Sequence, residues 1–549
     1  MNNSAINHSA DNNPMPYSPV MDAPPGSVSL AGNPGGAVIQ NTIPQPKRMG
    51  QRFRKMLDDF QYFGIGSFLY GILFTICLYK GFHGISLPAL SLATMVYLLL
   101  GFKRLDIKAG KSAWFYLSAW LVLSISNCLT GSQVLIFFNI CGILLLLLSF
   151  LLINFCDTKG WGLGKFFGEM FLAPFAAVAY VGYPFKSVGQ FIKSRKKGDS
   201  KLAGYIWLGI FISIPLLVVI IGLLVSADAV FRNLFELIFN YSYIKVPERP
   251  VYMCILLIVG ILGSYGIMAY LADGNINNAV PEKKPWEPVV GITFLSIITF
   301  VYLVFSVIQI SYLFLGNFDL PEGYTYAAYA REGFFQLLFV CLINLVIILV
   351  CVSRFRENIA LKLILTIFSC CTYIMIASSA LRMILYVESY QLTFLRILVL
   401  WALVVIAVLL VGCMITIYKK GFPLLQYITA AVTIFYIAFS LAKPDYLIAK
   451  YNLTYNREVV DLSYLVSLST DAVPAMEEAG IIEEILEKDG AVVMESGVIS
   501  SDERAASIYA RNLQFKADLS DEMGILDFNI SYYRAGDILS RYEIQAEEK

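Results

Sequence analysis

Long apolar stretches, separated by short polar ones, fill the chain from Phe60 to Ala442. Most of them are about 20 residues long, the length of helix that crosses a bilayer core about 30 Å thick at 1.5 Å per residue. The stretch from Val289 to Leu315, for example, contains no charged residue. The pattern predicts an all-α, polytopic membrane protein. Its eleven expected spans lie approximately at residues 60–79, 85–102, 113–131, 134–154, 205–227, 251–272, 289–315, 332–352, 362–387, 393–417 and 424–442.

Two further segments are not predicted to cross the membrane. The stretch from Phe166 to Phe185 is only weakly apolar, because it includes Glu169 and two prolines. We interpret it as a re-entrant or interfacial element on the cytoplasmic side, with Glu169 as an interfacial charge or, alternatively, as part of a re-entrant gate. The segment from Phe231 to Ile244 has apolar and polar residues on opposite helical faces, which predicts an amphipathic interfacial helix.

Basic residues are distributed unevenly between the loops. If the N-terminal flank is cytoplasmic, the loops on that side hold 24 lysines and arginines, and the loops on the other side hold five. Cytoplasmic loops of membrane proteins carry such an excess. The alternation holds only if residues 166–185 do not cross, since the basic segment from Lys186 to Lys201 would otherwise lie outside. We therefore predict a cell-membrane protein with a cytoplasmic N-terminus and an extracytoplasmic C-terminus.

The two ends of the chain differ in composition from its middle. Residues 1–46 are rich in Asn, Pro, Gly and Ser and contain no Lys or Arg. Such a composition cannot bury a core, so we expect a disordered cytoplasmic tail. Residues 47–445 form the expected transmembrane domain. Residues 446–549 contain 9 basic and 20 acidic residues, and we expect them to form a soluble extracytoplasmic domain. Its apolar positions predict helices over 462–479, 481–488, 501–515 and 530–542.

Composition argues against several kinds of chemistry. Charged residues make up 15% of the chain, against about 25% in soluble domains. Of the two histidines, His8 lies in the tail expected to be disordered and His83 lies in a short loop. A single His cannot build a metal cluster or a paired-His site such as HExxH, and we expect no His-based triad. Adjacent Cys370 and Cys371 lack the spacing of zinc ligands. We therefore expect no cofactor and no metal site. The expected partners are membrane lipids and a protein bound through the C-terminal domain, with no nucleic acid.

Charged residues gather where several spans reach the outer boundary of the membrane. A charge near the bilayer centre costs about 3 kcal/mol on insertion scales, so it usually marks pairing or function. The candidates are Asp228, Arg331, Glu332, Arg382, Glu388 and Arg396, with Tyr329 and Tyr386 at the same level. One interpretation is a set of interfacial charges within an aromatic belt. The other is a paired cluster that lines an outward-facing pocket, with Arg382 and Glu332 as the first expected pair. A proton relay is disfavoured, because no acid lies mid-span.

Four stretches carry a resemblance to known proteins. They are Leu224–Phe231, Tyr324–Leu337, Leu381–Arg396 and Pro444–Asn452. With them, residues 200–475 resemble bacterial multi-pass membrane proteins of the DUF4173 and DUF4153 type, which are described as domains of unknown function. Gln391 stands where the resemblance leads us to expect Gly. The resemblance implies the fold and the same charged positions, and it implies no activity.

Three functions are compatible with these observations. The first, which the two contrasting tails favour, is a non-enzymatic sensor, scaffold or accessory protein that acts through its external helical domain. The second is a transporter, although the spans show no internal repeat and no polar residue at the midplane. The third is an integral-membrane enzyme that acts on a lipid-linked substrate at the outer face. It would use the acids and arginines of the outer cluster, since Arg suits phosphate geometry.

Overall fold

The computed structural model describes residues 50–158, 160–185, 187, 248–274, 276, 285–311, 333–419, 421–455, 460–494, 501–521 and 523–542, together with four isolated positions between 213 and 224. These ranges contain helices and no β-strand, and one isolated β-bridge joins Trp286 to Phe355. The helices of the membrane part are α1 (Gln51–Asp58), α2 (Phe60–Leu78), α3 (Ser86–Arg104), α4 (Lys111–Leu129), α5 (Gln133–Phe155), α6 (Leu163–Val178), α10 (Glu248–Asp273), α11 (Pro288–Gln309), α13 (Phe334–Arg354), α14 (Ile359–Tyr390), α15 (Phe394–Tyr418) and α16 (Leu424–Leu441). The C-terminal part contains α17 (Pro444–Tyr455), α18 (Leu462–Ser467), α19 (Val473–Glu478), α20 (Ile481–Met494), α21 (Ser501–Asp521) and α22 (Ile530–Leu539).

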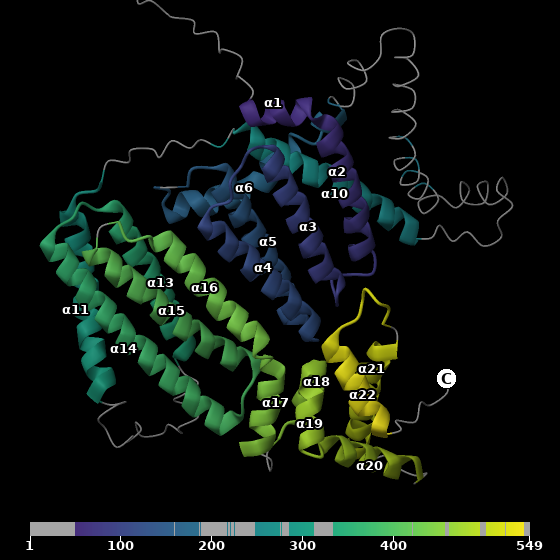
Figure 1. Cartoon of the computed structure of the whole chain (residues 1–549). Helices are drawn as coiled ribbons and strands as arrows, with labels where there is room; N and C mark the ends of the chain where they lie inside the picture. The colour runs from purple at the N-terminus through teal and green to yellow at the C-terminus, as the bar shows by residue number, and fades with distance from the viewer. Residues whose placement is uncertain are drawn as a thin grey trace, which may run out of the picture. The chain divides into compact units, whose positions relative to one another are not determined.

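Ten of the described helices are long and apolar enough to cross a membrane. They are α2, α3, α4, α5, α10, α11, α13, α14, α15 and α16 (Figure 1). Each of them falls on a span predicted from the sequence, so the prediction of an all-α polytopic membrane protein is confirmed. The eleventh predicted span, residues 205–227, and the amphipathic segment from Phe231 to Ile244 lie outside the described residues, apart from the four isolated positions.

The membrane helices pack around two apolar clusters. The first is formed by α1 to α6 and α10 and buries Trp120 and Tyr265. The second is formed by α11 and α13 to α16 and buries Phe368. Close helix contacts use small residues: a Cβ atom on Gly71 of α2 would lie 2.5 Å from the side chain of Ile261 in α10. Such contacts are typical of membrane helices, which associate through van der Waals packing because lipid tails are as apolar as the helices themselves.

One end of the membrane helices, which we call the α1 face, is tied together by ion pairs. Lys55 of α1 lies 2.5 Å from Asp106 in the α3–α4 loop. Arg104, at the end of α3, lies 2.8 Å from Asp59, between α1 and α2. These pairs are largely exposed, and each contributes less than about 1 kcal/mol to stability. They show that the ends of α1 and α3 and the start of α2 lie on the same side.

Helix α6 begins and ends at the α1 face. Its first residue, Leu163, lines the same cleft as the α3–α4 loop. Beyond its last turn, Tyr180 Oη donates a hydrogen bond of 2.7 Å to Asp273 Oδ2. The other oxygen of this carboxylate accepts a hydrogen bond of 2.9 Å from the backbone N of Gly50, just before α1. With 16 residues, α6 is therefore an interfacial or re-entrant element rather than a span, as predicted for residues 166–185.

The opposite end, which we call the C-terminal face, contacts the C-terminal helices. Ile85, in the α2–α3 loop, donates its backbone N–H to the carbonyl of Phe528 at 3.1 Å. Leu392, in the α14–α15 loop, donates to Asn452 Oδ1 of α17 at 2.8 Å. Val387 and Leu392 also belong to the apolar cluster of the C-terminal helices. Packing therefore continues across the predicted boundary at residue 445, and a separate domain over 446–549 stays a prediction.

The helix predicted over residues 462–479 is broken in the structure. Helix α18 ends at Ser467, a 3₁₀ turn spans Thr470–Ala472, and α19 follows. The apolar positions have helical spacing, but Pro474 has no N–H to donate and its ring clashes with the preceding turn of a continuous helix. The side chain of Ser469 accepts a 3.4 Å hydrogen bond from the backbone N of Asp471 and begins the 3₁₀ turn. The break turns Asp471 toward the membrane helices.

Candidate functional site

The structure describes half of the predicted outer charged cluster. Asp228, Tyr329, Arg331 and Glu332 lie outside the described residues. Within the described part, the guanidinium carbon of Arg396 lies 4.1 Å from the ring centroid of Tyr386. Glu388 is exposed, and no ion pair joins it to another described residue. The structure therefore joins two of the predicted residues and leaves the complete cluster as a prediction.

Arg396 also fixes the turn between α14 and α15. Its Nη1 donates to the carbonyl of Tyr390 at 2.5 Å and to the carbonyl of Gln391. Gln391, at the end of α14, has a φ of 71° and a ψ of 169°, a backbone conformation that is nearly restricted to Gly. This conformation explains why Gly was expected at the position. The positive charge of Arg396 therefore has a structural role at this turn.

Arg382 lies deeper than Arg396, with a relative exposure of 9%. Its Nη2 donates to Gln309 Oε1 of α11 at 3.4 Å, and Ser378 donates to the same oxygen at 2.6 Å. Gly333 begins α13 with a φ of 96°, and a Cβ atom on it would lie 3.1 Å from Arg382 Nη1. The guanidinium therefore lies beside the residue that directly follows Glu332 in the sequence. Glu332 itself lies outside the described residues, so the Arg382–Glu332 pair stays a prediction.

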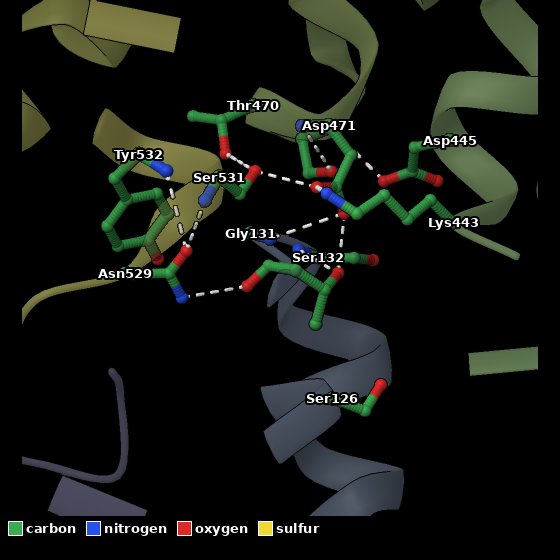
Figure 2. Close-up of polar contacts among 12 residues, drawn as sticks. Ser126, Gly131, Ser132, Lys443, Asp445, Thr470, Asp471, Asn529, Ser531 and Tyr532 are labelled. Atoms are coloured by element: carbon green, nitrogen blue, oxygen red, sulfur yellow. Dashed lines mark hydrogen bonds and ion pairs between the residues drawn. The ribbon is translucent and has the colours of Figure 1, made fainter. Parts of the chain in front are cut away.

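A second polar site, which sequence reasoning missed, lies at the C-terminal face. We call it the Asp471 junction, and it is drawn in Figure 2. The Asp471 side chain is 1% exposed. It accepts hydrogen bonds of 2.5 Å from Thr130 Oγ1 and 2.6 Å from Ser531 Oγ, with a weaker one of 3.3 Å from the backbone N of Gly131. Lys443 Nζ lies 3.4 Å from its Oδ1. One carboxylate thus joins the α4–α5 turn, the α16–α17 turn and α22.

Asn529 reinforces the junction from the start of α22. Its side-chain amide donates to the carbonyls of Thr130 at 3.0 Å and Asn127 at 3.3 Å. Its Oδ1 accepts from the backbone N of Ser531 at 2.8 Å and so caps α22. Asn529 is fully buried. Buried polar groups that are all hydrogen-bonded fix one arrangement of the elements they join. The junction therefore sets the position of α22 on the α4–α5 turn.

Two more buried charged groups lie behind the junction, in the C-terminal core. Asp445 accepts a 3.3 Å hydrogen bond from the backbone N of Ser469, and burial raises the pKa of its carboxyl group. Lys516 donates a 2.7 Å hydrogen bond to the carbonyl of Val466. Burial lowers the pKa of Lys516 to about 8, although the negative charge of Asp445 opposes the shift. Lys516 is thus a buried amine that loses its proton at moderately alkaline pH.

We expect the stability of the C-terminal core to rise between pH 8 and about 10. In this window the folded chain releases the Lys516 proton while the unfolded chain, with an ordinary pKa of 10.5, retains it. Stability rises with pH wherever the unfolded state binds more protons, by up to about 1.4 kcal/mol per pH unit for one group. Hydrogen exchange of the α21 amides, corrected for the intrinsic pH dependence, measures this slope. Lys516→Met should abolish it, and Lys450→Met, at an exposed lysine of α17, should leave it unchanged. An equal slope in the Lys516→Met protein would contradict the assignment.

Polar residues also lie within the spans, and one of them, Asn344, lies at the middle, contrary to the sequence interpretation. Asn344, halfway along α13, accepts from Tyr302 Oη at 3.0 Å and donates to Thr372 Oγ1 at 3.1 Å. Asn139 of α5 accepts from Tyr436 Oη at 2.8 Å and Ser440 Oγ at 2.9 Å. A single Asn in a long apolar stretch leaves the mean hydropathy of the stretch high, so the pattern did not reveal them. Since their neighbours satisfy them, we assign them to helix association.

The fold and the sites together define the class of the protein. It is an all-helical, multi-pass membrane protein whose C-terminal helices are hydrogen-bonded to and packed against the loops of its membrane helices. Residues 117–479 match the family model described as "Domain of unknown function (DUF4153)". The match covers more than half of the chain, so the chain belongs to this family, and the resemblance to the DUF4153 type is confirmed. The matched region contains Thr130, Lys443 and Asp471. No match was found among curated proteins or among solved structures.

Proposed function

We propose that this protein is a non-enzymatic sensor, scaffold or accessory protein of the cell membrane, which acts through its C-terminal helices on the extracytoplasmic side. The observation that carries the proposal is the Asp471 junction. Its buried carboxylate joins the 3₁₀ turn at Asp471 to three other segments, which suits a mechanical connection. A hydrolytic site would instead need a carboxylate accessible to substrate, and Asp471 is almost fully covered.

The contacts between loops and C-terminal helices support the proposed function. The α2–α3, α4–α5 and α14–α15 loops and the end of α16 all meet the C-terminal helices through Ile85, Thr130, Leu392 and Lys443. A displacement of the C-terminal helices would therefore act on several membrane helices at once. Conversely, a rearrangement of the membrane helices would change the position of α20 to α22 and so the surface that these helices expose.

We expect the C-terminus to lie outside the cell and the α1 face to lie in the cytoplasm. The basis is the excess of basic residues in the loops assigned to the α1 face, 24 against five. Reporter fusions after Lys201 and after Lys549 measure the two sides. We expect a cytoplasmic signal from the first and an extracytoplasmic signal from the second. A cytoplasmic signal from the C-terminal fusion would show the orientation to be wrong.

Photo-crosslinking tests the proposed action through the C-terminal helices. Ile508 and Phe515 lie two turns apart on α21 and are 58% and 63% exposed, on a face that they share with the exposed polar residues Arg511 and Asn512. A photoreactive residue at either position should give the same discrete protein adduct in cells, whereas Glu483 of α20 serves as an exposed polar control. Asp471→Asn should weaken the adduct by loosening the junction. If positions 508 and 515 gave no adduct, or gave the same products as position 483, the scaffold proposal would fail.

A further inference from the structure

The α1 face contains a cleft of about 1590 Å³ that the Asp471 junction does not involve. Its walls come from four places: the α3–α4 loop, the segment that joins α5 to α6, the end of α13 and the α15–α16 loop. It thus lies between helices of the first and of the second apolar cluster. The cleft is far larger than a single side chain needs, and it is open to the face that carries most of the basic residues.

The lining of the cleft contains three basic and two acidic side chains, so its formal charge is +1. Lys108, Lys165 and Arg354 line it, each from a different segment, together with Asp157 and Glu169. The lining therefore has an excess of positive charge, and it faces the side of the membrane that the loop charges assign to the cytoplasm. A basic pocket between membrane helices on that side is the sort of site that receives an anionic lipid headgroup.

A glycine-rich turn brings the start of α6 into the cleft. Gly160 has a φ of 86°, and Gly162 is the N-cap of α6, with no side chain capping the helix. A Cβ atom on Gly162 or on Gly164 would meet nothing within 4 Å, so the space beside the turn is open. The first N–H groups of an α-helix have no acceptor within the helix and carry partial positive charge. The turn therefore presents N–H donors and room for an anion.

Trp161 gives independent evidence for a missing acceptor. It lines the cleft and is 5% exposed, yet its Nε1 has no hydrogen-bond partner among the described residues. A buried indole N–H usually finds a partner. Lys165 Nζ lies 4.5 Å from the centroid of the Trp161 ring, so a positive charge lies beside the unused donor. The unused indole donor, the positive charge of Lys165 and the start of α6 therefore all belong to one short stretch of the cleft lining.

The remaining walls of the cleft are apolar. Val346, Leu349 and Val350 of α13 line one side, and Ile153 and Phe166 line the other. Leu349 and its neighbours belong to a membrane-spanning helix, so this wall continues toward the bilayer. A fully hydrated ion gains nothing from such a surface, whereas an amphiphile buries its acyl chain there while its headgroup reaches the basic end.

We propose that this cleft binds an anionic phospholipid, with the phosphate at the start of α6 beside Trp161, Lys165 and Arg354. The acyl chains lie along α13. The proposal goes beyond the function proposed above and does not depend on it, because the cleft and the Asp471 junction lie at opposite faces. A soluble phosphate ester shares the headgroup chemistry, and the apolar wall selects the lipid.

Quenching of tryptophan fluorescence by brominated lipids tests the proposal on the full chain in phosphatidylcholine nanodiscs. The Trp161 signal is the difference between the wild type and Trp161→Phe. We expect brominated phosphatidylglycerol to quench it at a mole fraction about tenfold lower than brominated phosphatidylcholine. Each basic residue near anionic lipid contributes roughly fivefold. Lys165→Gln with Arg354→Gln should therefore remove the preference, whereas the control pair Lys103→Gln with Lys362→Gln, which removes the same charge from the same face outside the cleft, should retain it.

Gly164→Leu provides a second test that does not depend on charge. Because a Cβ at this position meets no atom within 4 Å, the variant should fold and place its side chain in the cleft. It should lower the preference for phosphatidylglycerol at least severalfold. If the double charge variant is not monodisperse, this variant alone tests whether the cleft is the binding site. Absence of any preference in the wild type, or equal losses in the cleft pair and the control pair, would overturn the proposal. Displacement of the lipid by inorganic phosphate at ~10 mM would also overturn it, in favour of a soluble anion.

Discussion

Replacing Asp471 with Ala should destabilise the protein more than any other single change at the C-terminal face. The variant leaves the hydroxyl groups of Thr130 and Ser531 and the amine of Lys443 without their common acceptor. Each buried hydroxyl left without its acceptor costs about 1–3 kcal/mol, whereas the amine of Lys443, whose side chain is 30% exposed, can turn to water. We expect an apparent melting temperature lower by roughly 4 °C for the full chain in detergent, and a lower yield of monodisperse protein.

Two comparisons assign this loss to the junction. Asp537→Ala removes an acid of α22 whose ion pair with Arg541 is exposed, so it should cost less than about 1 kcal/mol. Thr130→Val removes one donor across the junction and should cost about 1 kcal/mol. In the Thr130→Val, Asp471→Ala double variant the losses should not add, since both act on the same contact. Additive losses, or equal losses for Asp471→Ala and Asp537→Ala, would show that the junction is not a cooperative unit.

The membrane helices could be predicted from the sequence because one local property, the length of an apolar run, determines where they form. A run of about 20 apolar residues has to form a helix to satisfy its backbone in lipid, whatever its neighbours are. Helices α4 and α15 accordingly fall within two residues of their expected bounds. That α6 does not cross could also be predicted, because a crossing there would have placed the basic residues that follow it on the side whose loops hold few basic residues.

The Asp471 junction could not be predicted, because its parts are far apart in the chain. Asp471 and Thr130 are separated by 341 positions. In the sequence, Asp471 is one of many acids in an acidic region, and Thr130 is an ordinary turn residue between two spans. Only Pro474 signalled that the predicted helix over 462–479 would break nearby. The outer charged cluster is the opposite case: its charges are conspicuous within apolar surroundings, so the sequence indicated Arg382 even though it could not supply Gln309 as its neighbour.

Replacing Arg382 with Ala should have the largest effect among the membrane helices. Arg382 is buried, and its loss removes a donor from Gln309 and leaves a polar space between α11, α13 and α14. If Glu332 is its partner, the variant also leaves an uncompensated charge at low dielectric, and the total cost should be about 3–5 kcal/mol. The measurement is the fraction of full-length protein that remains monodisperse after heating in detergent. Arg356→Ala, which breaks an exposed pair with Glu287, is the matched control and should cost less than about 1 kcal/mol.

The double variant decides whether Arg382 pairs with Glu332. Glu332→Gln alone should also destabilise the protein, because it leaves Arg382 as the unpaired charge. Combining it with Arg382→Ala should restore part of the loss, by about 1–3 kcal/mol, since neither charge is then left alone. The Gly333 backbone beside the Arg382 guanidinium gives the physical basis for this expectation. If the two losses simply add, or if the two side chains lie more than about 8 Å apart, twice the reach of an ion pair, the charges at this boundary belong to an aromatic belt instead. The contact between Arg396 and the Tyr386 ring would then be typical of all the charged residues at this boundary.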